Sequence, residues 1–198
     1  MKTGRRKRVL LVVTGLSPQV VTETVYALAV ERKPEWIPQE VRLVTTAEGA
    51  ERARLMLMDR KAGWFHRMRR EYGLPAMRFG EETLRVLLDR EGRPMQDIRT
   101  AEDNMAAADF LLREMRTVTG EAGSELHVSI AGGRKTMGFF AGYALSLCGR
   151  PQDVLSHVLV DPPFESHPGF FYPSRSPRVI HTAPPESRPL DASKARVT

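Results

Sequence analysis

Short continuous apolar runs alternate with longer segments of helical periodicity along this chain. The first run, residues 8–14, is rich in Val and Leu without polar alternation, which is typical of a strand buried on both faces. Further strands are expected at residues 41–45, 84–89, 126–130 and 154–160, with a short return strand at 95–98. Strands that alternate with helices pair in parallel through right-handed crossovers. The pattern therefore predicts an α/β fold: an open, mainly parallel Rossmann-like sheet with helices on both faces.

Helix boundaries can be read from the polar residues between these runs. Ser17 is a good N-cap and Pro18 suits a first helical position, so a helix is expected from there to Pro34. Thr46 is expected to cap a second helix that runs toward Tyr72, with a break at Gly63. Residues 100–103 resemble a capping box, with Asp in place of the usual Glu or Gln, and predict a third helix. A fourth helix is expected over residues 135–147.

The composition changes after Asp161, where prolines become frequent. Residues 170–172 are aromatic and are expected to pack back onto the domain, and 178–181 to form an edge strand. We expect one Rossmann-like domain over residues 1–182 and a disordered, Pro-rich tail over 183–198.

Charge and cysteine content narrow the functional classes. Net charge is +6 and the sequence pI is near 9.8, which favours an anionic partner but also fits a merely basic surface. The single cysteine, Cys148, excludes an internal disulfide framework and a multi-cysteine metal site, and we expect it in the core. No apolar run reaches about 18 residues, so no membrane span is expected. The basic segment 2–8 lacks the apolar region of a signal peptide, so we expect a cytoplasmic protein.

Two glycine turns carry the candidate chemistry. Each follows an expected buried strand and precedes a helix, at residues 14–19 and 131–136. Such junctions point backbone N–H groups at an anion. In a doubly wound sheet the first and fourth strands lie side by side at the ligand-binding switch point, so the two turns are expected to share one site. The alternative is that both turns only connect packed elements, but Lys, Arg, Ser and Gln are not needed there for packing.

Familiar nucleotide and metal signatures are missing. The second turn lacks the Gly-Lys pair of a P-loop because Arg134 follows Gly133, and the first turn lacks the dinucleotide glycine pattern. The histidines have no metal-ligand spacing, so neither a metal nor a cofactor is expected. His157 is interpreted as a core residue rather than a base. No helix-turn-helix segment is evident, so no sequence-specific DNA binding is expected.

The two turns resemble those of the CARF proteins, the CRISPR-associated Rossmann-fold sensors of type III systems. Val13–Thr24 reads VTGLSPQVVTET, and Ser129–Met137 reads SIAGGRKTM; residues 97–104 are a weaker third match. The resemblance covers roughly residues 8–172 and is closest to a small stand-alone group. It implies a homodimer that binds cyclic oligoadenylate, a ring of four or six adenylates, along its two-fold axis; cyclic tetra-adenylate is the expected ring. The ligand-binding residues it implies are Gly15, Leu16, Ser17, Pro18, Gln19, Arg99, Asn104, Gly132, Gly133, Arg134, Lys135 and Thr136.

Three functions remain open at this point. The first is a ring nuclease, expected because the sequence shows no second domain, in which the ribose 2′-OH attacks the adjacent phosphorus without a metal. Lys135 would then stabilise the phosphoryl charge and Ser17 would position the 2′-OH or a phosphate oxygen, with no evident general base. The second is a sensor that binds the ring and signals through a partner. The third is an unrelated Rossmann-type nucleotide protein.

Overall fold

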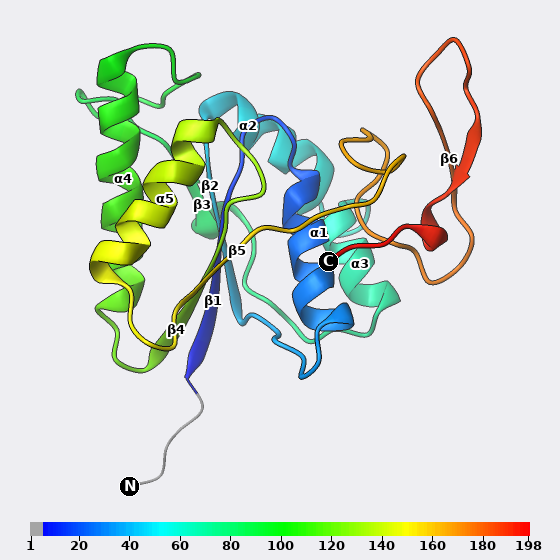
Figure 1. Ribbon diagram of the computed structural model, residues 1–198, viewed down its shortest axis with the longest axis horizontal. Coiled ribbons are helices and arrows are strands. Elements are labelled where there is room, and N and C mark those ends of the chain that lie inside the picture. The colour runs from blue at the N-terminus through cyan, green and yellow to red at the C-terminus, as the bar shows by residue number, and fades with distance from the viewer. Residues whose placement is uncertain (1–5) are drawn as a thin grey trace, which may run out of the picture.

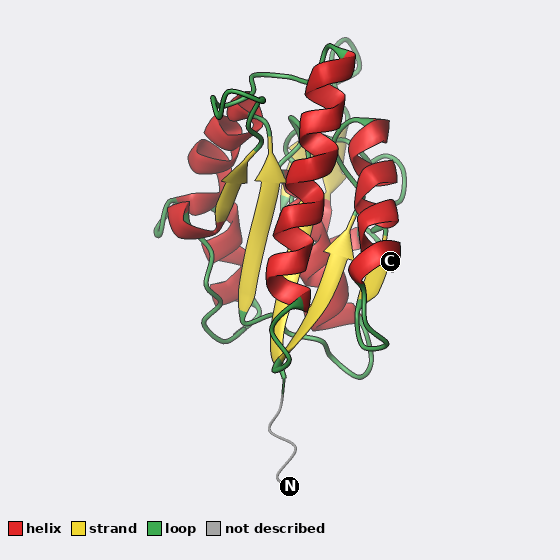
Figure 2. Cartoon of the chain, turned by 90° about the vertical axis from the view of Figure 1, so that its left-hand side faces the viewer, coloured by secondary structure: helices red, strands yellow, loops and turns green. Residues whose placement is uncertain are grey.

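The protein folds around a five-stranded parallel sheet with helices on both faces, as Figures 1 and 2 show. The computed structural model describes residues 6–198, so most of the basic segment 2–8, and the start of the expected domain, lie outside the described residues. The strands are β1 (Lys7–Val13), β2 (Glu40–Thr45), β3 (Leu84–Val86), β4 (Ser124–Ser129), β5 (Val154–Ser156), β6 (Val179–His181) and β7 (Pro189–Asp191). The helices are α1 (Gln19–Tyr26), α2 (Ala47–Ala53), α3 (Trp64–Glu71), α4 (Ala101–Thr119) and α5 (Lys135–Cys148). The predicted fold class is confirmed.

The central strand explains the sheet order β3-β2-β1-β4-β5. β1 pairs in parallel with β2 on one side and with β4 on the other. Its apolar run is continuous because alternate side chains enter different cores: Leu10 and Val12 one, and Val9, Leu11 and Val13 the other. The strand order reverses between β1 and β4, so ligand-binding loops are expected beyond that point.

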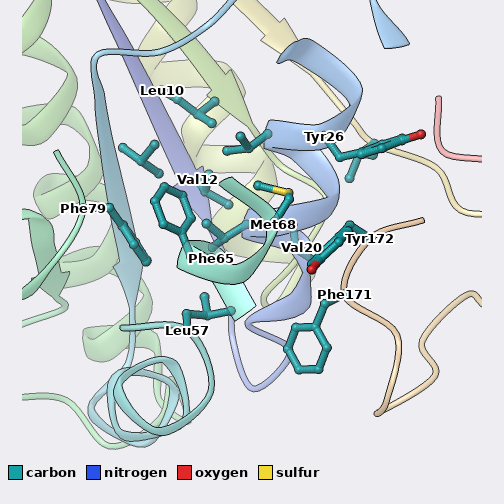
Figure 3. Close-up of a cluster of buried hydrophobic side chains, with 14 of the residues drawn as sticks. Leu10, Val12, Val20, Tyr26, Leu57, Phe65, Met68, Phe79, Phe171 and Tyr172 are labelled. Atoms are coloured by element: carbon teal, nitrogen blue, oxygen red, sulfur yellow. The ribbon is translucent and has the colours of Figure 1, made fainter. Parts of the chain in front are cut away.

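Each face of the sheet has its own helical layer. α1, α2 and α3 cover one face, and Figure 3 shows the apolar cluster beneath them, with Phe65 and Met68 of α3 against the β1 side chains. α4 and α5 cover the other face and lie side by side in Figures 1 and 2. Phe171 and Tyr172 belong to this apolar cluster beneath α1, α2 and α3, which confirms that residues 170–172 pack back onto the domain.

Most predicted helix boundaries are confirmed by their hydrogen bonds. The Thr46 side chain accepts a bond from the Gly49 N–H at the start of α2. Thr100 and Asp103 form the reciprocal capping box of α4. The segment after α2 continues as a π-helical turn, residues 54–58, and breaks before Gly63 as expected.

Ser17 departs from its predicted capping role. α1 begins at Gln19 with Pro18 as N-cap, and no side chain caps it. The Ser17 side chain is exposed, and only its backbone carbonyl is used, accepting a bond from the Thr14 hydroxyl at 2.9 Å. Its hydroxyl is therefore free for another role.

The C-terminal quarter is more ordered than expected. Residues 179–181 pair with 189–191 as a separate antiparallel hairpin, not as an edge strand of the main sheet. The tail 183–198 differs from the disordered segment predicted, because Ala192, Ala195 and Val197 are buried. β5 stops at Ser156 because the chain then turns toward this tail, where Val160 bridges Val197.

Cys148 is half-buried at the end of α5 and its thiol contacts the Ala144 carbonyl, so it lies at the margin of the core. None of the helices within residues 6–198 combines the length and apolar character needed to cross a membrane.

Candidate functional site

The two glycine turns touch beyond the carboxyl ends of β1 and β4, as their sequence positions predicted. A Cβ on Gly15 would lie 3.3 Å from the Gly133 Cα, and one on Gly132 would lie 2.7 Å from the Thr14 hydroxyl. Gly133 has a φ of +84°, a conformation that favours glycine. The glycines are therefore required for the close approach of the two backbones.

A cleft of about 450 Å³ opens at this junction, within the size range of small-ligand sites. It is formed by the β1–α1 and β4–α5 turns together with the first two turns of α1, the starts of α2 and α5, residues 96–97, and the segments 157–160 and 165–167. All of these lie on the carboxyl side of the sheet, where ligands bind in open α/β folds.

The cleft contains seven of the twelve predicted ligand-binding residues. These are Gly15, Leu16, Ser17, Gln19, Gly132, Gly133 and Arg134. Five others do not line it. Pro18 is buried as the α1 N-cap, Lys135 and Thr136 are exposed in the first turn of α5, Arg99 is exposed beside Asp97, and Asn104 lies on α4. Lys135 thus lies between two lining residues, Arg134 and Met137, without lining the cleft itself.

Backbone amides supply donors at the junction. In the described chain, the amides of Gly132, Gly133 and Arg134 donate no hydrogen bond, and neither do those of Gly15, Leu16 and Ser17. Unsatisfied amides at the start of a helix, here the 14-residue α5, are donors of the kind that bind anions. The carbonyl oxygens of Gly15 and Ser17 are already used, by Thr45 and Thr14.

Arg134 is held in place by Asp97. Its guanidinium donates two hydrogen bonds to the carboxylate, at 2.9 and 2.5 Å. These bonds lower the pKa of Asp97 to about 2, and Arg99 adds a third, longer contact of 3.4 Å. The bidentate pair fixes the guanidinium plane at the cleft and leaves further N–H groups for a ligand.

Glu23 lines the candidate site and was not among the residues predicted from the sequence. It lies one helical turn beyond Gln19 on α1, lines the cleft, and has only 8% of its surface exposed. Burial alone raises the pKa of its carboxyl group to about 7, because no neighbouring charge or hydrogen bond opposes the desolvation. The available signal was that Glu23 is the one charged residue between Ser17 and Val30.

The two histidines at the cleft differ in whether their ring nitrogens already make hydrogen bonds. His167 accepts a bond from the Gly169 N–H, and its other ring nitrogen lies 2.7 Å from the His181 carbonyl, so both ring nitrogens are occupied. His157 is exposed and lines the cleft, so the prediction of a core histidine is wrong for this residue. It was placed in a strand that ends at Ser156, one residue earlier. The buried histidine is His127, whose pKa burial lowers to about 4.

The charge of the lining is mixed rather than strongly cationic. Asp97 is neutralised by Arg134, and the Glu48 carboxylate is 3.2 Å from Arg52. Glu165 is exposed at the rim. Within residues 6–198, no three His, Cys, Asp or Glu side chains gather closely enough to hold a metal ion. The groups that could hold an anion here are the free amides, Arg134 and the adjacent Lys135.

The sequence and the structure were compared with those of known proteins. A search of curated proteins gave no match. Among solved structures, the chain is similar to one from Listeria monocytogenes described as a candidate UDP-N-acetylglucosamine 2-epimerase, at 18% identity and a TM-score of 0.37. That alignment covers 77% of this chain and 31% of the other, so the chain spans about a third of that protein.

The sequence profile of CRISPR-associated protein NE0113 (Cas_NE0113) matches residues 17–197. This range includes Ser17, Glu23, the β4–α5 turn and the ordered C-terminal tail. It covers nearly the whole of the described chain. The protein therefore belongs to the NE0113 family of CRISPR-associated proteins.

Proposed function

We propose that the protein is a CRISPR-associated ring nuclease of the CARF type, which binds cyclic tetra-adenylate and cleaves it without a metal. The observation that supports this most directly is the contact between the two glycine turns, which brings free amides from both into one cleft. A ligand with phosphates at regular spacing can use both sets of donors. The products would be linear adenylates with 2′,3′-cyclic phosphate ends.

The proposed mechanism uses the substrate's own nucleophile. The ribose 2′-OH attacks the adjacent phosphorus and the bond to the 5′ oxygen breaks. Amides of Gly132 and Gly133 would hold a nonbridging phosphoryl oxygen, and Lys135 would reach the same phosphate from the first turn of α5. Ser17, free of any capping bond, would orient the 2′-OH or a phosphate oxygen. In-line alignment is the main contribution of these residues.

The proposal also requires a homodimer, and the surface of α5 supports one. Phe139, Tyr143 and Leu147 follow each other at helical spacing and are 67%, 59% and 59% exposed. Leu155 of the edge strand β5, which lies against Gly142 of α5 and is 40% exposed, extends this apolar face. A second copy seated there by two-fold symmetry would bring a second cleft beside the first, one for each half of the ring. Light scattering that gives a 22.3 kDa species with and without ligand would contradict this arrangement.

A cleavage assay tests the proposal. Purified protein is incubated with cyclic tetra-adenylate in EDTA and the products are resolved by chromatography. Lys135→Ala should lower the single-turnover rate by about 10²–10³-fold, the scale of losing one oxyanion donor. Lys33→Ala is the matched control, because Lys33 is an exposed lysine between α1 and β2, on the amino side of the sheet. Equal rates for both variants would remove Lys135 from the mechanism.

A sensor that binds the ring without cutting it is the second candidate. It is favoured by the position of Lys135 outside the cleft lining. Tight binding of an intact ring over many hours would support this candidate and exclude the nuclease. Binding of NAD or ATP in place of every cyclic oligoadenylate would exclude both.

A further inference from the structure

Glu23 is a largely buried residue at the proposed ring site, and its carboxyl group has no partner of its own among the described residues. It projects from the second turn of α1, one turn beyond Gln19, toward the cleft formed by the two glycine turns. Its surface is 92% buried, yet the carboxyl group has neither an ion pair nor a hydrogen bond among the described residues. A buried, unpaired carboxylate is costly to the fold, so a role in the cleft accounts for its presence better than packing does.

The surroundings of Glu23 fit a group that handles protons. Glu23 and Ser17 line the cleft from α1 and the β1–α1 turn, and the free amides of Gly132 and Gly133 line it from the β4–α5 turn that contacts this turn. A phosphate held by those amides would place the adjacent ribose against the α1 wall. The pKa of Glu23, about 7, gives it both protonation states at neutral pH, which is the range in which a general base is most effective.

We propose that Glu23 is the general base of this site and accepts the proton of the attacking ribose 2′-OH. This rests on the proposed ring-nuclease function and adds the base that the motifs alone did not identify. As the 2′ oxygen bonds to phosphorus, its proton moves to the Glu23 carboxylate and the bond from phosphorus to the 5′ oxygen breaks. The 5′ oxygen takes a proton from water, and the carboxylic acid returns its proton to the resulting hydroxide. The products are a 2′,3′-cyclic phosphate and a 5′-hydroxyl.

Other ionisable groups also face the cleft and must be separated from Glu23. Asp97 is paired with Arg134, Glu48 is near Arg52, and Glu165 is exposed at the rim. His167 has both ring nitrogens occupied. His157 remains, and histidine is the other residue type that changes charge near neutral pH. The test therefore includes His157→Gln beside Glu23→Gln.

The experiment measures single-turnover cleavage of cyclic tetra-adenylate in EDTA between pH 5 and 9, and ring affinity separately. Glu23→Gln keeps the shape of the side chain and removes the base. It should lower the rate by about 10²–10⁴-fold at pH 8 and abolish the rise in rate with pH, while affinity stays within about threefold. Glu51→Gln is the control, an exposed glutamate on α2 outside the cleft, and should match the wild type.

The outcomes separate this proposal from the one on which it rests. A wild-type protein that binds but never cleaves the ring overturns the nuclease and the base together. Wild-type cleavage with an unchanged rate in Glu23→Gln overturns the base alone. A pH profile that survives in Glu23→Gln but disappears in His157→Gln assigns the base to His157 and also overturns the proposal for Glu23.

Discussion

Two buried glutamates at opposite ends of the strands have pKa values that are shifted in opposite directions. Glu40 begins β2 on the amino side and Glu23 faces the cleft on the carboxyl side; they are 1% and 8% exposed. Desolvation acts against ionisation of Glu40, but hydrogen bonds from Lys7 and Arg42 outweigh it and lower its pKa to about 2. Burial acts unopposed on Glu23 and raises its pKa to about 7.

The difference is that Glu40 contributes to the stability of the sheet, whereas Glu23 is available for a function. Glu40 is surrounded by three cations, with Lys7 at 2.7 Å, Arg42 at 2.6 Å and Arg78 at 3.4 Å. Its charge is matched, so it ties β1 and β2 to Arg78 in the segment that precedes β3. The charge of Glu23 is unmatched, which costs stability and leaves the group available to a ligand.

Removing the charge of Glu40 should have the largest effect on stability. Glu40→Gln leaves Arg42, itself buried, with only the more distant Glu114 carboxylate at 3.8 Å. We expect a loss of about 3 kcal/mol in the free energy of unfolding, measured by urea denaturation at pH 7. Glu35→Gln, which breaks an exposed pair with Lys33, should cost less than about 0.5 kcal/mol. Equal effects of the two variants would show that the Glu40 network adds nothing.

Removing the charge of Glu23 should stabilise the protein at pH 8 but not at pH 4. A folded pKa raised above the usual 4.5 means that the native state is favoured below pH 4.5 and loses stability as pH rises through about 7. Glu23→Gln should therefore gain roughly 1–3 kcal/mol at pH 8 and almost nothing at pH 4. Thermal unfolding at both pH values checks this. A loss of stability at pH 8 would mean that the carboxylate has a partner in solution.

Substitution of Ser17 should have the smallest effect on stability, and it tests whether this residue contacts the ligand. Because its side chain makes no capping bond, Ser17→Ala should change the unfolding free energy by less than about 0.5 kcal/mol, against the 0.5–2 expected for a lost cap. Ser17→Asp should fold normally yet lose the cyclic tetra-adenylate, because a carboxylate would face a phosphate. Native cleavage by Ser17→Asp would exclude Ser17 from the site.

The sequence predicted the architecture where periodicity was strong. The apolar run of β1, the caps at Thr46 and Thr100 and the meeting of the two glycine turns were all read correctly. The tail was not, because its order depends on isolated apolar residues such as Val197 that contact distant parts of the chain. Isolated contacts of this kind leave no periodic pattern.

The sequence predicted the backbone turns of the candidate site but not all of the side chains that line its cleft. Glycine turns after strands have a local signature, so the residues of both turns were found. Glu23 was overlooked because a helix that is buried all round gives no polar face to notice: every α1 residue from Val20 to Tyr26 is buried. His157 was misplaced because the apolar residues around it extended the predicted strand beyond Ser156.

The pairing of residues 159–161 with 196–198 has a practical consequence for handling the protein. Leu159 and Thr198 exchange two backbone hydrogen bonds, and the Asp161 side chain accepts one from the Arg196 amide. Leu159 and Val160 line the cleft, so a purification tag or reporter fused after Thr198 would be attached directly behind that wall. The described chain begins at the far end of β1, away from the cleft (Figure 1). Tags should therefore be fused before β1, because a tag after Thr198 could disturb the cleft wall and alter the measured activity.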